Sequence, residues 1–446
     1  MDIPVKSGKQ KRVVIVGGGF AGLTLAKNLS RSYFQIVLID KNNYHQFQPL
    51  LYQIATSGLE PSSISFPLRK IFQQYNDIYI RIAEVTNILP NQNRVETSIG
   101  TIDYDYLVLA NGAETNYFNN KSLQRNAFSM KSVSEALYLR NNLLQNFEQA
   151  LISNDEKERR ALLQIVIVGG GPTGVELAGA IAEMKNYILP KDYPELDFKQ
   201  MNIVLIEASS RLLSAISEQS GKVARRYLEY LGVRVCLNTS VNNYDGITVT
   251  LNTGIALSSR CLVWAAGVKG RTINGLPLSS ILPNNRIRVD SFNRVIGLPL
   301  IFALGDIAAI QEGESSKGHP QVAPVAIQQA RLLAKNLKNM ASGKELISFR
   351  YHDKGSMATV GRNLAVIEMG KLKIKGCGAW VIWMFVHLMS IIGIKNKLVI
   401  LINWIWHYMT YDQSLRLILK PSDKKRNPSN EKLIDPVIAH RYSVGL

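Results

Sequence analysis

The chain has 446 residues, of which 46% are hydrophobic and 19% charged, a globular composition that excludes an intrinsically disordered protein and allows about three domains. Its three cysteines, Cys236, Cys261 and Cys377, lie far apart and outside any metal-binding spacing, so we predict no disulfide framework, no metal site and a reducing compartment. The net charge of +18 would suit a nucleic-acid-binding protein, but most of it lies in the last quarter of the chain, so we predict no nucleic-acid partner.

The first predicted unit runs from a strand at Val13–Val16 through a helix at Ala21–Ser30 to a strand at Gln35–Asp40. No apolar run typical of an export signal precedes this unit, so we expect no cleaved export signal. The turn between the first strand and the helix reads G-x-G-x-x-G, which presents backbone N–H groups and a helix N-terminus to a pyrophosphate. Asp40 follows Gly17 at the spacing of a ribose-binding carboxylate, although an ordinary strand-end turn residue is the alternative.

A long connection follows this unit at residues 42–72. It is polar and aromatic, and we expect it to cover a ligand, because connections of this length are uncommon without a function. The segment YDYLVLANGA at 104–113 then predicts a buried strand that ends in a small-residue turn. A backbone without large side chains can approach a cofactor closely at such a turn.

The sequence IVIVGGGPTGVEL at 165–177 repeats the strand, the glycine-rich turn and the start of a helix. Its second strand, Asn202–Glu207, comes late because residues 185–200 form an insertion. CLVWAAGV at 261–268 and LIFALGDIAAI at 300–310 add two more strands, each followed by a turn of small residues. We therefore predict an α/β protein with two Rossmann-like dinucleotide-binding domains, the second inserted in the first, that pass electrons between two nucleotides.

The last quarter of the chain is basic and rich in tryptophan. From Arg331 onwards, 19 lysines and arginines stand against 7 aspartates and glutamates. Four of the five tryptophans lie there: Trp380, Trp383, Trp404 and Trp406. Cations beside aromatic and apolar segments are typical of proteins that bind an anionic lipid surface, and an ordinary basic surface is the alternative.

Two apolar segments, Ala379–Ile394 and Leu398–Tyr411, are separated by Lys395-Asn396-Lys397. Each is shorter than the roughly 20 residues of a spanning helix, so we expect both to lie on the bilayer or dip into it. A short hairpin within the bilayer and a dimer interface are the alternatives. The predicted domains are residues 11–125 and 283–350 for the first nucleotide, 160–282 for the second, and 351–446 for a membrane-anchoring region with amphipathic helices at about 379–420.

This nested order resembles the two-dinucleotide-binding flavoproteins, and the finer resemblance is to the type II NADH dehydrogenases, over nearly the whole chain. Beyond the glycine-rich turns it rests on GGGPTGVELAGAIAE (169–183), WAAGV (264–268), FALGD (302–306), VAPVAIQQ (322–329) and DKGSMATVGRNLAV (353–366). Two segments are specific to this family: NYHQFQPLLYQIATSGL (43–59) and the apolar block 379–412.

The resemblance implies that non-covalent FAD occupies the first unit and that NADH, as co-substrate, occupies the second. The implied FAD-binding residues are Gly17, Gly18, Gly19, Phe20, Ala21, Gly22, Asp40, Lys41, Ala110, Gly112, Asp306 and Val325. The implied NADH-binding residues are Gly169, Gly171, Pro172, Thr173, Gly174, Glu207, Ala266 and Gly267. A carboxylate at Glu207 suits the two ribose hydroxyls of NADH and would repel the extra phosphate of NADPH, unless Glu207 is only a surface glutamate at a strand end.

Two further residues are implied to be catalytic. Glu176 lies in the first turn of the second helix, where nicotinamide and flavin should meet, and the family's glutamate there is proposed to position nicotinamide or assist proton delivery; stabilisation by the helix dipole is the alternative. The family's A-Q-x-A-x-Q quinone signature reads Ala323-Pro324-Val325-Ala326-Ile327-Gln328, so Gln328 is kept but proline replaces the first glutamine. Proline has no amide to bond a quinone carbonyl, and Gln328 could equally be a scaffold residue.

The implied reaction is a hydride transfer from NADH to FAD, followed by two-electron reduction of a membrane quinone, menaquinone or ubiquinone, without proton pumping. The implied location is peripheral, on the cytoplasmic face of the bacterial inner membrane, and the implied assembly is a homodimer. A disulfide reductase is excluded because residues 1–235 contain no cysteine, and a sulfide:quinone oxidoreductase would need paired cysteines. A membrane-recruited nucleotide sensor without turnover is the remaining rival.

Overall fold

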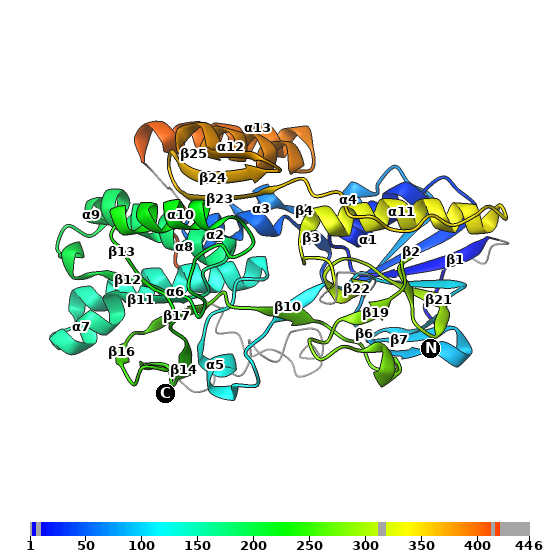
Figure 1. The fold of residues 1–446 in the computed structure, drawn as a ribbon, viewed down its shortest axis with the longest axis horizontal. Coiled ribbons are helices and arrows are strands. Elements are labelled where there is room, and N and C mark those ends of the chain that lie inside the picture. The colour runs from blue at the N-terminus through cyan, green and yellow to red at the C-terminus, as the bar shows by residue number, and fades with distance from the viewer. Residues whose placement is uncertain (1, 6–9, 311–317, 412–414, 420–446) are drawn as a thin grey trace. The chain divides into compact units, whose positions relative to one another are not determined.

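The computed structural model describes residues 2–5, 10–310, 318–411 and 415–419. Residues up to Arg416 form one compact unit. That unit contains two large β-sheets, one for each glycine-rich turn, and a smaller C-terminal sheet with two helices (Figure 1).

The first sheet has eight strands in the order β22-β19-β20-β21-β9-β1-β2-β5. Their bounds are β1 (Lys11–Val16), β2 (Phe34–Asp40), β5 (Ile78–Ile82), β9 (Tyr106–Leu109), β19 (Ile287–Val289), β20 (Arg294–Val295), β21 (Leu298–Ala303) and β22 (Ala308–Ile310). The central strand β1 is parallel to both β2 and β9, and β21 is parallel to β9, so their carboxyl ends meet at one edge. Helices α1 (Phe20–Leu29) and α11 (Ala323–Ala341) pack against each other over one face.

The connection after β2 is folded into short elements. These are β3 (Tyr44–Gln46), η1 (Gln48–Leu50), α2 (Leu51–Ala55), α3 (Pro61–Ile64), β4 (Ser65–Pro67) and α4 (Leu68–Ile71). A side sheet of β6 (Val85–Leu89), β7 (Arg94–Thr97) and β8 (Gly100–Asp103), with η2 (Pro90–Gln92), lies before β9.

The second sheet has four parallel strands in the order β13-β12-β11-β17. Their bounds are β11 (Gln164–Val168), β12 (Asn202–Ile206), β13 (Val233–Cys236) and β17 (Cys261–Trp264). The helices of this part are α5 (Lys121–Asn126), α6 (Val133–Ile152), α7 (Glu156–Leu163), α8 (Pro172–Glu183), η3 (Met184–Ile188), α9 (Leu189–Asp192), η4 (Phe198–Gln200) and α10 (Glu218–Tyr230). A hairpin sheet of β14 (Val241–Tyr244), β15 (Thr248–Leu251) and β16 (Ala256–Ser258) completes it.

One small ribbon joins the two sheets. Strand β10 (Ala113–Thr115) follows the first sheet's β9 and pairs antiparallel with β18 (Val268–Gly270), which follows the second sheet's β17. The chain then passes through η5 (Leu278–Ser280) back to the first sheet, whose β21 is followed by η6 (Gly305–Ile307). The first sheet thus contains strands from both sides of the second in the sequence, and the predicted nested α/β architecture is confirmed.

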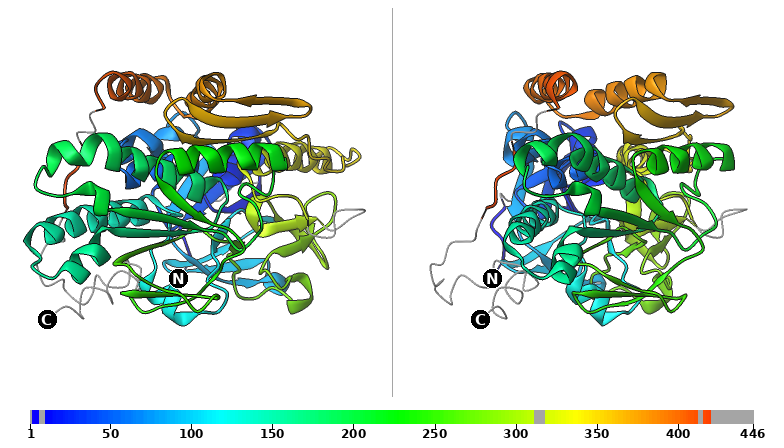
Figure 2. Two further views of the ribbon diagram at one scale, coloured as in Figure 1. Left: turned by 60° about the vertical axis from the view of Figure 1, so that its left-hand side comes forward. Right: turned by 90° about the vertical axis from the view of Figure 1, so that its left-hand side faces the viewer.

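The C-terminal part stacks a three-stranded sheet and two helices over α8 and α2 (Figures 1 and 2). Its strands are β23 (Ser356–Gly361), β24 (Leu364–Met369) and β25 (Leu372–Lys375), and its helices are α12 (Cys377–Ser390) and α13 (Ile394–Thr410). Among the described residues, no helix combines the length and the apolar character needed to cross a membrane.

The charge pattern predicts a break between the two C-terminal helices at Lys395-Asn396-Lys397. The structure places the break elsewhere. Those residues form the first turn of α13, and the chain turns at Ile391–Gly393 instead. Gly393 precedes α13 with φ +82°, a conformation that glycine adopts without steric cost. The glycine conformation, and not the charged residues, therefore marks the turn that precedes the second helix.

Candidate functional site

The first glycine-rich turn forms a tight cradle at the carboxyl edge of the first sheet. Gly17 has φ +105°, and a Cβ there would overlap the carbonyl of Ala110. A Cβ on Gly22 would overlap the carbonyl oxygen of Gly17, so the helix can lie this close to the strand only with glycine. Gly19 caps α1 without a side-chain hydrogen bond, and a Cβ there would meet nothing within 4 Å. The open space in front of the helix N-terminus fits a pyrophosphate.

Asp40 ends β2 beside this cradle. Its Oδ2 accepts a hydrogen bond from the N–H of Gly18 at 2.6 Å, and its Oδ1 accepts one from the N–H of Asn42 at 2.7 Å. Burial raises the pKa of Asp40, while the two backbone N–H groups act in the opposite direction. The carboxylate is therefore held rigidly at the rim, as a ribose-binding group must be.

Several side chains cover the first cradle. The ring of His45 donates from Nδ1 to the Gly18 carbonyl at 2.9 Å and packs edge-on to Phe20, and burial lowers the pKa of His45 to about 4, so the ring is neutral. Gln329 of α11 accepts a hydrogen bond from the N–H of Gly305 at 2.7 Å. This contact fixes the turn that carries Asp306, whose pKa is raised by burial.

The second cradle repeats the geometry of the first. Gly169 has φ +115°, a Cβ on Gly174 would overlap the Gly169 carbonyl, and a Cβ on Gly171 would meet nothing within 4 Å. The N–H of Gly170 donates to Oε2 of Glu207 at 2.5 Å, and Oε1 accepts from the N–H of Ser209 at 2.7 Å. Glu207 thus stands in the second unit where Asp40 stands in the first.

The predicted nucleotide-binding residues gather at these two edges. Strand pairing brings Val16, Leu109 and Ala303 together, and with them the turns that follow. The first edge thereby collects Gly17, Gly18, Gly19, Phe20, Ala21, Gly22, Asp40, Ala110, Gly112 and Asp306, with Val325 buried on the neighbouring α11. The second collects Gly169, Gly171, Pro172, Thr173, Gly174, Glu207, Ala266 and Gly267. Lys41 follows Asp40 and is exposed.

Helix α8 begins at the second cradle and carries Glu176, Ala180 and Glu183 on one face, at spacings of four and three residues. The backbone of β23 lies directly on this helix, because a Cβ on Gly179 would overlap the carbonyl of Val360. The Thr359 N–H consequently donates to Oε1 of Glu176 at 3.4 Å, and the Arg362 N–H donates to Oε1 of Glu183. Strand β23 and the residue that follows it therefore supply one backbone donor to each carboxyl.

Both carboxyls titrate far from their ordinary range. Burial raises the pKa of Glu176 to about 8, with the Thr359 N–H and the Trp383 indole acting in the opposite direction. Burial likewise raises the pKa of Glu183 to about 7, opposed by the N–H and the charge of Arg362. Each acid is thus protonated, or partly so, near neutral pH, which is the property of a group that can donate a proton.

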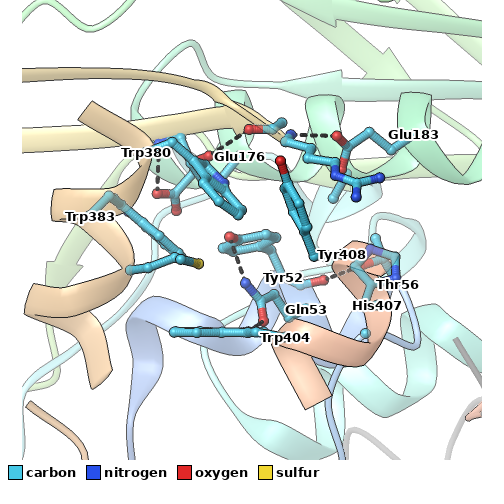
Figure 3. Close-up of a pocket in the computed structure, with 16 residues that line it drawn as sticks. Tyr52, Gln53, Thr56, Glu176, Glu183, Trp380, Trp383, Trp404, His407 and Tyr408 are labelled. Atoms are coloured by element: carbon cyan, nitrogen blue, oxygen red, sulfur yellow. Dashed lines mark hydrogen bonds between the residues drawn. The ribbon is translucent and has the colours of Figure 1, made fainter. Parts of the chain in front are cut away.

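Glu176 and Glu183 line a pocket with a cavity volume of about 80 Å³ (Figure 3). The pocket lies between α2, α8, β23, α12 and α13, and aromatic side chains dominate its wall: Tyr52, Trp380, Trp383, Trp404 and Tyr408. The Trp404 Nε1–H donates to Oε1 of Gln53 at 2.9 Å, and the Nε2–H of Gln53 donates to the Tyr52 hydroxyl at 2.9 Å. The aromatic lining suits a flat, apolar ligand with a few polar atoms.

Comparisons with known proteins agree over almost the whole chain. The model of the pyridine nucleotide-disulphide oxidoreductase family matches residues 11–330, and that of the NDH2 C-terminal domain matches residues 353–410. The type II NADH:quinone oxidoreductase Ndh of Mycobacterium tuberculosis is 37% identical over 415 residues, which cover 89% of this chain and 88% of the relative. The chain belongs to the type II NADH dehydrogenase family.

Two more similar proteins add detail. A type II NADH:quinone oxidoreductase of Haemophilus influenzae is 31% identical over 387 residues, covering 80% of this chain and 86% of the relative. The structure of NDH2 from Plasmodium falciparum in complex with NADH superposes with a TM-score of 0.85 and 22% identity, covering 92% of this chain and all of the other. The latter likeness shows that the fold is shared.

Of the two residues predicted to be catalytic, the structure places only Glu176 in the pocket of this type II NADH dehydrogenase. Gln328 lies on α11, where its amide donates to the His352 carbonyl at 2.9 Å and accepts from the His352 N–H at 3.0 Å. Both polar ends of Gln328 are therefore engaged by backbone. Pro324 stands at the start of α11, in the first turn, where its missing N–H costs nothing.

Sequence reasoning missed several pocket residues. Tyr52 and Gln53 belong to the connection that we expected to cover a ligand, but nothing in the sequence singles them out. Glu183 could have been found from its spacing to Glu176, which puts both acids on one helix face. Trp380, Trp383 and Trp404 line the pocket, whereas Trp406 is 60% exposed, so three of the four tryptophans assigned to a lipid surface face a cavity instead.

Proposed function

We propose that this protein oxidises NADH and reduces a membrane quinone through a non-covalently bound FAD. One observation carries this proposal: each cradle sends an element into the same pocket. The segment that holds His45 against the first cradle continues into Tyr52 and Gln53 on the pocket wall, and α8 leads from the second cradle to Glu176. Two nucleotide sites that converge on one aromatic pocket suit a relay of electrons to a third molecule.

FAD fits the first cradle. The free N–H groups at the start of α1 would bind its pyrophosphate, Asp40 its adenosine ribose, and Asp306 the ribityl chain or pyrophosphate region. Bound FAD would accept a hydride from NADH and pass two electrons on. The chain's own part is to hold and orient the ring system and to exclude water through the cover formed by His45 and Phe20.

NADH would bind the second cradle, with its pyrophosphate at the start of α8. Glu207 is proposed to accept hydrogen bonds from the adenosine ribose hydroxyls. A 2′-phosphate would meet the carboxylate as a like charge, so NADH should be preferred over NADPH.

A quinone would occupy the pocket under α12 and α13. Its ring would lie against the indoles, and the protonated carboxyl of Glu176 would donate to a carbonyl oxygen that becomes a quinol hydroxyl. The overall reaction takes NADH, one proton and a quinone to NAD⁺ and a quinol, so the pocket must supply one proton per turnover from solvent. In this proposal a residue of the pocket, Glu176, contacts the quinone carbonyl. Gln328 has a positioning role, because its amide links α11 to the backbone of His352.

The outer faces of α12 and α13 are proposed to lie on a lipid surface. Their exposed apolar side chains include Val381, Phe385, Met389, Ile394, Leu398, Ile402, Ile405, Trp406 and Met409. Exposed lysines at 371, 373, 375 and 395 flank them, as anionic lipid would require. The cationic residues from 420 onwards lie outside the described residues. Location on a cytoplasmic membrane face, a homodimer and the absence of proton pumping remain predictions from the family resemblance.

The experiment that tests the function is spectroscopic. The purified protein should be yellow, NADH should bleach the flavin absorbance, and a quinone such as ubiquinone-1 or menadione should restore it. A colourless protein that does not take up FAD on reconstitution would contradict the proposal. A flavin that NADH reduces but that quinones fail to reoxidise would restrict the protein to nucleotide binding or sensing.

A further inference from the structure

Two acids of helix α8 line the pocket at different depths. Glu176 is 8% exposed, whereas Glu183 is partly exposed and lies next to Arg362 at the turn between β23 and β24. Seven helical residues separate them, which corresponds to about 10.5 Å along the axis. A group between the two carboxyls would shorten the path of a proton between these two levels of the helix.

Tyr52 is the candidate for that group, because it is buried and lines the same pocket as Glu176 and Glu183. Burial raises the pKa of the Tyr52 hydroxyl, and the charges of Glu176 and Glu183 act in the same direction. Its oxygen accepts a hydrogen bond from Gln53, whose amide orientation is set by the Trp404 indole. Because Tyr52 is the acceptor in that bond, its own O–H remains a donor for another partner. Figure 3 shows Tyr52 in the pocket with Glu176 and Glu183.

We propose that Glu183 and Tyr52 form the route by which solvent protons reach Glu176 in the quinone pocket. The inference rests on the proposed function, since it concerns the one proton taken up when NADH reduces a quinone. Glu183 takes a proton from solvent and gives it, directly or through one water in the cavity, to the oxygen of Tyr52. Tyr52 gives its hydroxyl proton to the carboxylate that Glu176 becomes after protonating the quinol oxygen, and each group returns to its starting state.

The electrostatics of the wall suit groups that exchange protons. Burial raises the pKa of Glu183 to about 7 and that of Glu176 to about 8, so both carboxyls can take up and release a proton near neutral pH. The other titratable groups facing the pocket are Arg362, His407 and Tyr408. The Arg362 guanidinium stacks 3.8 Å from the Tyr408 ring centroid, and its charge lowers the pKa of Glu183 and keeps that carboxyl able to release its proton near neutral pH.

The test measures flavin reduction by NADH and quinone turnover separately in two variants, Glu183→Gln and Tyr52→Phe. Glutamine keeps the acceptor for the Arg362 N–H, and phenylalanine keeps the ring of Tyr52. Flavin reduction by NADH, followed by stopped flow, should be unchanged in both variants, while turnover with ubiquinone-1 should fall by roughly tenfold or more. In the parent, quinone turnover should decline as pH rises through the range from 7 to 8; in Glu183→Gln the part of this decline near pH 7 should vanish. Added imidazolium should partly restore the rate of Glu183→Gln.

Glu368→Gln is the matched control, because Glu368 also accepts a backbone N–H, that of Ser217 at 3.0 Å, but lies outside the pocket lining. Its turnover and pH profile should equal those of the parent. Lower turnover without a changed pH profile and without rescue would mark Glu183 as merely structural and overturn the inference, as would full turnover in both variants. Should Glu183→Gln not fold, the rate and pH profile of Tyr52→Phe decide alone. Failure of NADH to reduce the flavin in the parent would instead overturn the proposed function.

Discussion

The two cradles share one backbone geometry but differ in what covers them. In the first, the residues that follow Gly19 are partly or fully buried: Phe20 packs against His45, and Ala21 is 4% exposed. In the second, the equivalent Pro172 and Thr173 are exposed. The same phosphate-binding turn is thus enclosed in one unit and open in the other.

The two turns also differ in what donates a hydrogen bond to the carbonyl of their second glycine. The carbonyl of Gly18 is bonded by the His45 side chain, from the folded connection that closes over the cradle, whereas the carbonyl of Gly170 accepts the backbone N–H of Leu213 at 2.8 Å. A covered cradle suits a cofactor that stays bound, and an open one suits a coenzyme that must leave after each turnover. Under the proposed function, the difference in cover, and not the shared glycine motif, would separate a resident FAD from an exchanging NADH.

The largest effect is expected from alanine at the third glycine of each turn. In Gly22→Ala the Cβ would overlap the Gly17 carbonyl, so the strand and helix must separate, at a cost of about 3 kcal/mol and with loss of the flavin. Gly174→Ala should keep the flavin and lose NADH. Gly19→Ala is the control: its Cβ has free space and an ordinary φ of −73°, so the apoprotein should keep its melting temperature while FAD uptake falls. Flavin absorbance and thermal melting measure both, and equal melting temperatures for the Gly22→Ala and Gly19→Ala apoproteins would contradict the packing argument.

A smaller effect is expected from neutralising the two carboxylates at the rims. Asp40→Asn should weaken FAD binding, and Glu207→Gln should lower kcat/KM for NADH by roughly 10- to 100-fold while leaving the flavin content unchanged. The ratio of NADPH to NADH activity should rise in Glu207→Gln only. Titration of the apoprotein with FAD and steady-state kinetics with both coenzymes check this. An unchanged coenzyme preference in Glu207→Gln would remove Glu207 from the ribose site.

Much of this architecture could be predicted from the sequence, because its signals are local. A buried strand, a glycine turn and a helix occupy consecutive residues, so β1 and α1 are found within two residues of their predicted bounds, and β11 and α8 lie on either side of the second turn as predicted. The pocket could not be predicted in the same way. Its wall combines Tyr52, Glu183 and Trp404, which only tertiary packing brings together. The close approach of β23 to α8, which depends on Gly179, has no signature in a single sequence.

The helices that start at the two cradles also differ, and pH should reveal this. Helix α1 carries no acid, whereas α8 carries Glu176 and Glu183 with raised pKa values. Between about pH 4.5 and 8 the folded state binds more protons at these groups than the unfolded chain, so the free energy of unfolding should fall as pH rises through that window. In Glu176→Gln the free energy of unfolding should fall less over this window than in the parent, by an amount on the order of 2 kcal/mol.

Thermal melting of parent and Glu176→Gln at several pH values measures the difference. The two should melt alike near pH 5, and the variant should melt at the higher temperature above pH 8. Asp40→Asn, in the covered cradle, should show a smaller rise in melting temperature over the parent above pH 8. The reason is that backbone N–H groups at both oxygens of Asp40 oppose the effect of burial, which raises its pKa. Parallel melting curves of parent and Glu176→Gln across this range would mean that the carboxyl is ionised in the folded protein.

The smallest expected effect tests the cover itself. His45→Phe keeps the ring that packs against Phe20 and Phe66 but removes the donor to the Gly18 carbonyl. A buried neutral hydrogen bond contributes about 1 kcal/mol, so FAD should dissociate with a Kd roughly five times higher, while the KM for NADH stays constant. Because the matching carbonyl in the second cradle is bonded by the backbone of Leu213, no side-chain change can remove that bond, and the asymmetry is itself testable. Equal weakening of both nucleotides in His45→Phe would show that the connection at 42–72 supports the whole molecule and does not act as the lid of one cradle.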